Sequence, residues 1–453
     1  MAQIKKPRFK LWLLMTTAAV FWTFLAGVNR DLSAASDETY RGLKLFSDVI
    51  ELIEKNYVDP VDSKELIQKA IHGMVQGLDP HSSLLPPEAL EELQMETQGE
   101  FGGIGIVITQ EDEVFKVISP IEGTPAYKAG IIAGDRIITV DGQSTKGMML
   151  WEAVKKMRGP KGTEVVLTIE RDEAPEPLEF KLIRDLIPIE SIRHLTLQPG
   201  YGYIWITNFR ENTTEDLEKT LNTLETGSEP LKGLVLDLRD NPGGLLNQAI
   251  SVSDLFLNDG IIVSIKGRLK SHTQTFRANP DTQIRTYPIV ALINGGSASA
   301  AEIVAGALQD HKRALILGTT SFGKGSVQTV ENLRDGYGLK FTIARYYTPS
   351  GRSIQAQGIE PDVTVRQRFV EEKVSAEKPE RGMKEKDLKN HLEPESKPEV
   401  KAHPVQKPEE QSAYPEALNL ETLKSDQQVQ RALEILTSYE IFAGTKETPA
   451  SGN

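Results

Sequence analysis

The sequence predicts an α/β protein of several domains, with a small β-rich module inserted ahead of the main domain. Three observations support this prediction. The chain has 453 residues, which is more than one hydrophobic core usually holds. Residues 186–368 alternate strand-like and helix-like segments, as in domains built on a largely parallel buried sheet. Residues 96–185 instead contain short strands rich in Ile and Val.

The N-terminal segment, residues 1–35, has the pattern of a signal peptide or a membrane anchor. Its basic cluster consists of Lys5, Lys6, Arg8 and Lys10. An uncharged run of 18 residues follows at 11–28, which is long for a signal peptide and just long enough to span a bilayer. The small residues at 33–35 favour cleavage. In both cases the basic flank stays in the cytoplasm. We therefore expect a periplasmic protein, soluble or anchored to the inner membrane, whose membrane contact is confined to this segment.

The next two regions differ in periodicity. Residues 37–95 are expected to be helical, because SDVIELIEKNYV and SKELIQKAIHGMVQGL place apolar residues at helical spacing. The sequence from Asp79 to Ser83 interrupts them and predicts a turn. In the module at 96–185 the expected strands are GIGIVIT, VFKVISPI, RIITV, EVVLTIE and EFKLI. Two short helical pieces, PAYKAG and MMLWEAVKKM, lie between them, and Asp141-Gly142 predicts a tight turn.

The main domain and a tail follow. Between 186 and 368 the expected strands are YGYIWITNF, GLVLDLR, IVALIN and ALILG, and the expected helices are TTEDLEKTLNTLE, LLNQAISVSDLFL and SAAEIVAGALQD. Residues 369–412 are rich in Lys, Glu and Pro and nearly free of aromatics, so we expect a disordered linker. Residues 413–453 contain one amphipathic helical pattern, SDQQVQRALEILTSYEIF. A docking or dimerisation role and a plain surface helix both remain open for it.

Composition and charge exclude several classes of function. The formal net charge is −12, which argues against a nucleic-acid partner, since such a partner needs a basic face. The chain has no cysteine, so disulfides, thiolate nucleophiles and cysteine-ligated metals are excluded. The seven histidines show no metal-ligand spacing. We therefore expect no metal site.

Three segments carry candidate chemistry, and each follows an expected strand. They read NGGSASAAE at 294–302, SFGKGSVQ at 321–328 and DLRDNPGG at 237–244. Ser299 at a helix start would face the positive end of the helix dipole, and an N-cap role is the alternative. Lys324 lies between two glycines and can reach into a site without crowding, and a solvated loop lysine is the alternative. The third segment offers backbone N–H groups for an oxyanion, and a tight strand-to-helix turn is compatible with that role.

Six motifs in order make the chain resemble the carboxy-terminal processing proteases, also called tail-specific proteases. They are GIGI, AGIIAGDRIITVDG, DLRDNPGG, NGGSASAAEI, GTTSFGKGSVQ and YYTPSGRSIQAQGIEPD. The resemblance covers about residues 40–368. It implies a ClpP/crotonase-like protease core with a PDZ domain inserted after N-terminal helices. It also implies a serine-type endopeptidase without metal or organic cofactor, which recognises apolar C-terminal tails of exported or envelope proteins.

The resemblance assigns roles to matching residues. It makes Ser299 the nucleophile and Lys324 the general base, and their offset of 25 residues agrees with the family. Gln328 matches the glutamine that orients the lysine amine. The chemistry is consistent, because a free lysine titrates near ~10.4 and burial favours the neutral amine that a base must be. Such a pair works through an acyl-enzyme.

The oxyanion hole is also implied by the resemblance. The backbone amide of Ala300 matches one donor, and that of Gly243 or Gly244 matches the other, with the choice between the glycines left open. Ala301 departs from the family pattern, because many members have a serine at that position. Ser299 and the segment around the lysine are intact, so the departure puts little in doubt.

The PDZ module has a candidate site of its own. The segment Gly103-Ile104-Gly105-Ile106 resembles the loop whose amides receive a peptide's terminal carboxylate while the peptide adds as a β-strand. Leu150, Val154 and Met157 share a helical face. They would either line the apolar pocket or belong to the core. For Arg158, at the end of that helix, contact with a substrate or with the protease body and a solvated position are the alternatives.

Two other functions are weighed against the peptidase. A catalytically inactive PDZ scaffold or chaperone is opposed by the intact Ser299, Lys324 and Gln328. A crotonase-like acyl-CoA enzyme is opposed by the export signal and the PDZ module. The expected partners are protein substrates bound through their C-termini. An adaptor protein and a homo-oligomer formed through the N- and C-terminal helices are kept as further expectations.

Overall fold

The computed structural model describes residues 38–111, 114–172, 174–227, 229–280, 285–366, 384–392 and 419–446. The chain divides into two compact units, residues 1–77 and residues 78–453. In the first unit, a helix over residues 38–56 precedes α2 (Ser63–Gln76), which Asp62 caps by accepting a hydrogen bond from Lys64 N. The expected signal peptide or anchor at 1–35 lies outside the described residues. Among the residues that are described, no helix has the length and apolar character needed to cross a membrane.

The second unit opens with the predicted turn. The Asp79 carboxylate accepts hydrogen bonds from His81 N and Ser82 Oγ, and these bonds stabilise the turn. The short strand β1 (Ser83–Leu85) and helix α3 (Pro87–Gln98) follow. Helix α3 ends at Gly99, whose φ of 78° is the left-handed conformation that suits glycine.

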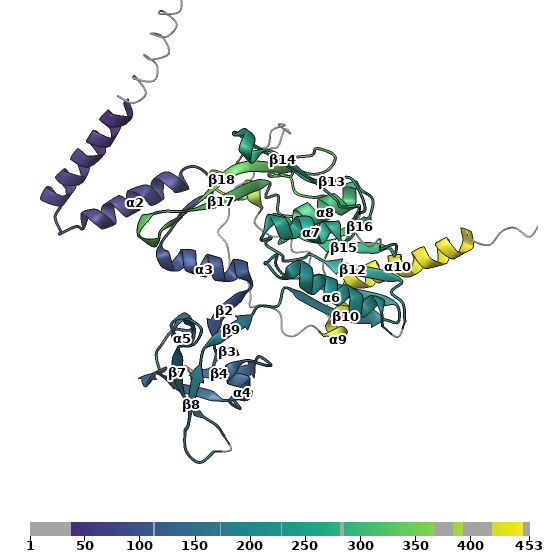
Figure 1. The fold of residues 1–453 in the computed structure, drawn as a ribbon, viewed down its shortest axis with the longest axis horizontal. Helices are drawn as coiled ribbons and strands as arrows, with labels where there is room; N and C mark the ends of the chain where they lie inside the picture. The colour runs from purple at the N-terminus through teal and green to yellow at the C-terminus, as the bar shows by residue number, and fades with distance from the viewer. Residues whose placement is uncertain are drawn as a thin grey trace, which may run out of the picture. The chain divides into compact units, whose positions relative to one another are not determined.

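The expected PDZ module is an antiparallel sheet with two short helices (Figure 1). Its strands are β3 (Ile106–Glu111), β4 (Val114–Pro120), β5 (Arg136–Val140), β6 (Gln143–Ser144), β7 (Glu164–Glu170) and β8 (Leu178–Ile183), and its helices are α4 (Pro125–Lys128) and α5 (Leu150–Met157). The order is β3-β4-β5-β7-β8, with β6 on β5, so β3 is an edge strand. Strands β2 (Glu100–Gly103) and β9 (Asp185–Pro188) pair antiparallel where the chain enters and leaves the domain.

The main domain, the expected protease core, is built on a second six-stranded sheet. Its strands in spatial order are β10 (Ile192–Gln198), β11 (Tyr201–Ile206), β12 (Gly233–Asp237), β15 (Ile289–Ile293), β16 (Ala314–Gly318) and β19 (Val363–Thr364). Only the β10–β11 pair is antiparallel. Strands β12 and β15 are buried along their whole length, which explains their continuous apolar sequences.

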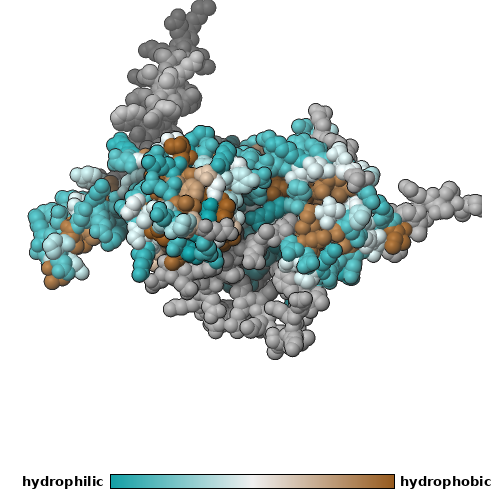
Figure 2. Space-filling view, turned by 90° about the horizontal axis from the view of Figure 1, so that it is seen from below, coloured by the Kyte–Doolittle hydropathy of each residue, from teal (hydrophilic) through white to brown (hydrophobic). Residues whose placement is uncertain are grey.

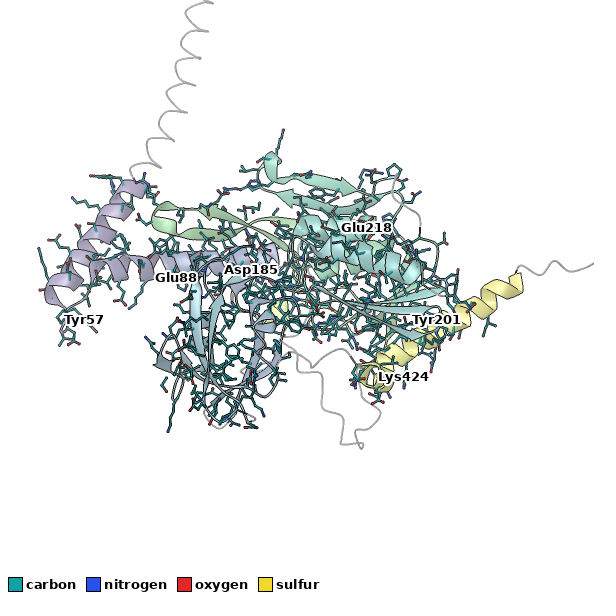
Figure 3. The ribbon with its side chains drawn as sticks, turned by 60° about the horizontal axis from the view of Figure 1, so that its bottom comes forward. Tyr57, Glu88, Asp185, Tyr201, Glu218 and Lys424 are labelled. Carbon is teal, nitrogen blue, oxygen red and sulfur yellow. The ribbon has the colours of Figure 1, made fainter. Side chains whose placement is uncertain are left out.

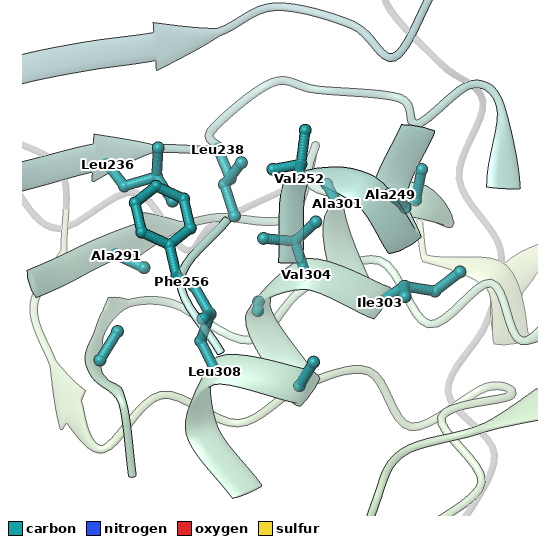
Figure 4. Close-up of a cluster of buried hydrophobic side chains, with 14 of the residues drawn as sticks. Leu236, Leu238, Ala249, Val252, Phe256, Ala291, Ala301, Ile303, Val304 and Leu308 are labelled. Atoms are coloured by element: carbon teal, nitrogen blue, oxygen red, sulfur yellow. The ribbon is translucent and has the colours of Figure 1, made fainter. Parts of the chain in front are cut away.

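Helices cover both faces of this sheet. Helices α6 (Thr213–Glu225), α7 (Leu246–Asp254) and α8 (Ala300–Asp310) pack on one face. Figure 4 shows the α7 and α8 side chains, Ala301 among them, packed around Leu236, Leu238 and Ala291. Helices α9 (Leu420–Ser425) and α10 (Gln427–Lys446) pack on the other face through residues such as Leu423 and Leu436. Tyr201, labelled in Figure 3, donates a hydrogen bond to Glu440 of α10 at 2.6 Å.

A five-stranded antiparallel sheet was not expected from the sequence. It contains β1, β13 (Ile261–Gly267), β14 (Gln274–Arg277), β17 (Ser326–Asn332) and β18 (Gly338–Tyr347). The 3₁₀ turns η1 (Lys270–His272) and η2 (Arg334–Gly336) lie in its connections. Strand β17 begins directly after the loop that leaves β16, so this sheet fixes the far end of the loop that carries Lys324.

The expected linker at 369–412 is only partly within the described residues. Its segment Lys384–Leu392 contains the 3₁₀ turn η3 (Glu385–Asp387) and packs on the protease core. A buried carboxylate and several hydrogen bonds attach these residues to the core, and the rest of the expected linker lies outside the described residues. On the face drawn in Figure 2, polar residues cover most of the coloured surface, and apolar residues gather in separate patches between them.

Candidate active site

Three loops meet at the carboxyl ends of adjacent parallel strands, the edge where open α/β sheets bind ligands. The glycine loop (residues 238–245) follows β12 and leads into α7. The serine loop (residues 294–299) follows β15 and leads into α8. The lysine loop (residues 319–325) follows β16 and leads into β17. The topology therefore brings together all three segments that carry candidate chemistry in the sequence.

Hydrogen bonds fix the three loops to one another. Ser297 Oγ donates to the Leu238 carbonyl at 2.7 Å, and Ala298 N donates to the Asn241 carbonyl at 2.9 Å. Phe322 N donates to the Ser297 carbonyl at 3.0 Å. The serine loop is thus held from both sides, which gives a nucleophile at its end a defined position.

Ser299 has a strained backbone at the start of α8. Its φ of 53° and ψ of −111° lie outside the regions that residues with a side chain normally occupy. Such a conformation costs on the order of 1–3 kcal/mol and persists where the surroundings enforce it. Here Ser299 N donates to Glu302 Oε2 at 2.8 Å. The sharp turn presents the serine at a helix N-terminus, where developing negative charge is stabilised.

Glu302 joins the serine loop to the lysine loop. Its side chain is fully buried, and besides Ser299 N it accepts hydrogen bonds from Ser321 Oγ at 2.5 Å, Gly323 N at 2.8 Å and Lys324 N at 2.9 Å. Burial raises the pKa of Glu302 to about 7, although these four donors oppose the shift. No role for this residue could be inferred from the sequence. The S-x-x-E spacing of a capping box was the available signal, but it does not indicate that the carboxylate also binds a distant loop.

Lys324 lies half-buried in the lysine loop. Burial is the largest cause that lowers the pKa of its amine, and the positive charge of Lys340 lowers it further. The negative charges of Glu385, Glu302 and Asp79 oppose this shift without reversing it. A lowered pKa increases the fraction of neutral amine at a given pH, which is the form that can accept a proton.

Tyr346 of β18 links the same two segments from the other sheet. Its hydroxyl donates to the Ser299 carbonyl at 3.2 Å and also lies against the Lys324 carbonyl. The ring is almost completely buried. No sequence signal distinguished this tyrosine from its neighbours on β18. Its role depends on contacts of its hydroxyl with the serine and lysine loops, which are distant in the chain.

Two of the expected contacts are not formed. Within the described residues, no hydrogen bond joins Ser299 Oγ to the Lys324 amine, and none joins Gln328 to Lys324. The Gln328 side-chain nitrogen instead donates to Ser326 Oγ at 2.9 Å and to Thr342 Oγ1 at 3.2 Å. Its carbonyl oxygen is left as the end available to an amine. Catalytic hydrogen bonds are often loose without substrate, so geometry of this kind does not remove a candidate.

The two candidate glycines differ in their hydrogen bonds. Gly243 N donates to Asn241 Oδ1 at 2.8 Å, so this amide is occupied. Within the described residues, neither Gly244 N nor Ala300 N has an acceptor. A β-carbon on Gly243 would come within 2.7 Å of the Ser299 β-carbon and 3.0 Å of Ala300 N. The glycine loop therefore lies directly against the start of α8.

The candidate carboxylate loop of the PDZ domain connects β2 to β3. Gly103 ends β2, Ile106 begins β3, and Ile104 is buried in the PDZ core. Gly105 has a φ of 75°, and a β-carbon there would clash with Thr124. Within the described residues, the N–H groups of Ile104 and Gly105 have no acceptor. Adjacent free amides around a left-handed residue form the kind of concavity that binds anions.

The apolar residues of α5 differ in how deeply they are buried. Met157 is buried in the PDZ core, Leu150 is 38 % exposed and Val154 is half-buried. The guanidinium of Arg158 lies 4.6 Å from the centre of the Phe101 ring, in a cation–π contact with β2. Met157 therefore belongs to the core, while Leu150 and Val154 remain near the surface.

In the part of the chain that the structure describes, no group of three or more His, Asp or Glu side chains is arranged to hold a metal ion.

Comparison with known proteins gives matches across the chain. Peptidase family S41 matches residues 200–365, a PDZ domain matches residues 116–171, and the N-terminal domain of the activating protease CtpB matches residues 24–88. The carboxy-terminal-processing protease of Bartonella bacilliformis is 49% identical over 331 residues, which cover 73% of this chain and 76% of that protein. The carboxy-terminal processing protease CtpA of Bacillus subtilis is 36% identical, over 79% of this chain and 77% of that protein.

A solved photosystem II D1 C-terminal processing protease is 32% identical, covering 71% of this chain and 92% of that one, with a TM-score of 0.42. The sequence matches above, with the loops and strands described here, decide the assignment. The protein is a serine-type peptidase of family S41 with an α/β core, an inserted PDZ domain and helices at both ends. The chain belongs to the family of carboxy-terminal processing proteases.

Proposed function

We propose that this peptidase is an endopeptidase in which Ser299 is the nucleophile and Lys324 is the general base. One observation carries the proposal. Ser299 N and Lys324 N donate to the same oxygen, Glu302 Oε2, at 2.8 Å and 2.9 Å. The backbones of these two residues, which are 25 positions apart in the chain, are therefore held by one carboxylate oxygen. We infer that their side chains belong to one site.

The reaction follows from these two groups. The neutral Lys324 amine removes the proton of Ser299 Oγ, and the alkoxide attacks the scissile carbonyl carbon. The tetrahedral intermediate collapses, and the Lys324 ammonium returns its proton to the departing amine, which leaves an acyl-enzyme. Lys324 then takes a proton from water, the hydroxide attacks the ester, and Ser299 is released with its proton restored. These steps need no metal or organic cofactor.

The oxyanion of each tetrahedral intermediate needs two donors near Ser299. We assign Ala300 N and Gly244 N, because both amides lack an acceptor within the described residues. Gly243 N is already bound to Asn241 Oδ1. The role of Gly243 is to allow close packing against Ser299. Gln328, through its carbonyl oxygen, is proposed to orient the Lys324 amine once substrate is bound.

The PDZ domain is proposed to bind the free, apolar C-terminus of a protein substrate. Ile104 N and Gly105 N would receive the carboxylate, and the peptide would add as a strand to the exposed edge of β3. The side of α5 that carries Leu150 and Val154 would accept the last apolar side chain. Amidating the C-terminus of a binding peptide should weaken its affinity clearly, and equal affinity of the acid and amide forms would refute this mode.

Export and assembly complete the proposal. The basic cluster and apolar run at 1–28 are proposed to send the protein across the inner membrane, where it cleaves exported or envelope proteins. A reporter that works only outside the cytoplasm, fused after residue 40, should be active, and activity of a cytoplasm-only reporter there would contradict this. Homo-oligomer formation through the terminal helices, and an adaptor protein, remain predictions. Tyr439 and Ile441 of α10 are exposed apolar residues that such contacts would cover.

The catalytic assignment is tested with Ser299→Ala, Lys324→Ala and the double variant on a peptide substrate. Each single change should reduce turnover by about two to four orders of magnitude. The double variant should be little worse than either, because the two residues act as a unit. Binding of a C-terminal peptide to the PDZ domain should persist in all three. Additive losses, or a Lys324→Ala variant that keeps most of its turnover, would contradict the assignment.

A further inference from the structure

The segment Lys384–Leu392, here called the docked segment, contacts the lysine loop on its outer side. Lys384 Nζ donates to the carbonyls of Thr320 and Ser321, and Glu385 N donates to the Phe322 carbonyl at 3.3 Å. Three consecutive residues of the lysine loop are therefore hydrogen-bonded to this segment. The segment belongs to the region 369–412, which is rich in Lys, Glu and Pro.

Glu385 is the buried residue of this segment. Its side chain is 0 % exposed, and its carboxylate accepts a hydrogen bond from Gln355 Nε2 at 3.0 Å and lies 2.7 Å from His81 Nε2. Gln355 Oε1 in turn accepts Gly325 N at 2.9 Å. The docked segment thus contacts the lysine loop directly at Phe322, two residues before Lys324, and reaches Gly325, the residue after Lys324, through Gln355. Burial of a carboxylate is unfavourable unless hydrogen-bond partners compensate the loss of water, as Gln355 and His81 do here.

We propose that Glu385 is a positioning residue of the peptidase, which fixes the lysine loop from outside and contributes a carboxylate to the charged groups around Lys324. This inference rests on the proposed role of Lys324 as general base. No feature of the sequence assigned a role to Glu385, because it lies in a segment whose composition predicts disorder.

The charges around Lys324 give the proposal a measurable consequence. The charged groups that influence the pKa of its amine are Lys340 on β18, Glu385 in the docked segment, Glu302 on α8 and Asp79 in the turn before β1. Removing the charge of Glu385 removes one of the three groups that raise the pKa of Lys324. The acid limb of the pH–rate profile, which reports loss of the ammonium proton, should therefore move to lower pH.

Glu385→Gln tests the charge, and Glu385→Ala tests the positioning. The amide of glutamine can still accept from Gln355 and contact the His81 ring, so Glu385→Gln should keep the fold while the acid limb of kcat/KM against pH moves to lower pH. Glu385→Ala should lower kcat by about 10²-fold, the scale of a misplaced catalytic group, while KM and peptide binding to the PDZ domain stay unchanged. Glu360→Gln, the same change at an exposed carboxylate nearby, is the matched control and should alter neither quantity.

Several results would overturn the proposal. A pH profile of Glu385→Gln that coincides with that of the wild type would show that the charge has no influence. An increase in kcat for Glu385→Ala would show that the docked segment inhibits the enzyme. If both Glu385 variants fail to fold, Lys384→Met removes the other anchor and should lower kcat, and an unchanged kcat would refute the positioning role. If Ser299→Ala and Lys324→Ala stay active, the catalytic assignment fails instead, which separates the two outcomes.

Discussion

Glu302 provides a prediction in which stability and activity respond differently to pH. The ordinary pKa of 4.5 is raised to about 7 in the folded protein, chiefly by burial. For an acid with a raised pKa, the favourable contribution of the protonated form is present at low pH and is lost as the pH rises through about 7. The difference corresponds to about 3 kcal/mol of unfolding free energy. Ionisation of this one carboxyl should therefore destabilise the wild-type protein as the pH increases.

Glu302→Gln removes this ionisation and replaces an acceptor oxygen with an NH₂ group. The new donor must face either the amides of Ser299 and Lys324 or the partners Ser321 and Gly323, so hydrogen bonds are lost at every pH. The wild type should therefore be the more stable protein at low pH. Its advantage should shrink by about 2–3 kcal/mol between about pH 5 and about pH 8.5. Turnover of the variant should fall by about 10²-fold, because the serine and lysine loops lose their common anchor.

The assay is urea unfolding of the wild type and Glu302→Gln across this pH range, followed by circular dichroism. Glu331→Gln on β17, an exposed carboxylate, is the matched control and should track the wild type. A stability difference between the wild type and Glu302→Gln that stays constant with pH would show that Glu302 does not titrate in this range. Wild-type turnover in Glu302→Gln would refute its role as the link between the loops.

Two further predictions concern packing at the site. Gly243→Ala should reduce turnover by about 10²-fold, because its β-carbon would come within 2.7 Å of the Ser299 β-carbon. Gly142 also has a positive φ, 74°, but a β-carbon there would meet no atom within 4 Å. Gly142→Ala therefore measures the cost of the backbone conformation alone and should leave turnover intact. Asp426→Ala should destabilise the core by about 1.5–3 kcal/mol, since buried Arg239 loses the partner at 2.6 Å but keeps its contacts with Asp237 and Gln428. Glu434→Ala, an exposed position on α10, should change the melting temperature little, and equal shifts for both would contradict this account.

Much of the fold could be predicted from the sequence, because its elements have clear local patterns. The buried strands β12, β15 and β16 are continuous apolar runs, and α6 and α8 have helical periodicity, so their existence followed from burial and spacing. The antiparallel sheet of β13, β14, β17 and β18 was missed. Its strands are short or amphipathic, and β18 mixes residues such as Lys340 and Arg345 with apolar ones.

The candidate site was predictable only where it is local. Ser299 and Lys324 lie in motifs that small residues mark in the sequence. Glu302, Tyr346 and Glu385 were not identified, because each acts through contacts with segments that are distant in the chain. Glu385 is the clearest case. The composition of the residues around it predicts disorder, but its buried, hydrogen-bonded carboxylate attaches the segment to the core. Composition describes the average behaviour of a segment, whereas docking depends on single contacts.

The C-terminal helices show the same limit. Their amphipathic pattern predicted a helix, but it did not identify the surface that the apolar side covers. Burial of Val429, Ala432 and Leu436 against the protease sheet decides this, and the ion pair between Arg239 and Asp426 attaches α10 next to the glycine loop. The tail is therefore part of the protease core.

The measurement that tests the central claim most directly is the pH dependence of kcat/KM in the wild type and in Lys324→Arg. If neutral Lys324 is the base, wild-type activity should rise with pH along a limb that lies below the ordinary lysine value of 10.5, since burial lowers the pKa of this amine. Lys324→Arg keeps a positive charge but has no neutral form in this range, so its turnover should fall by about two to four orders of magnitude. Substantial activity in Lys324→Arg, together with its loss on replacing one of the seven histidines by alanine, would contradict the account.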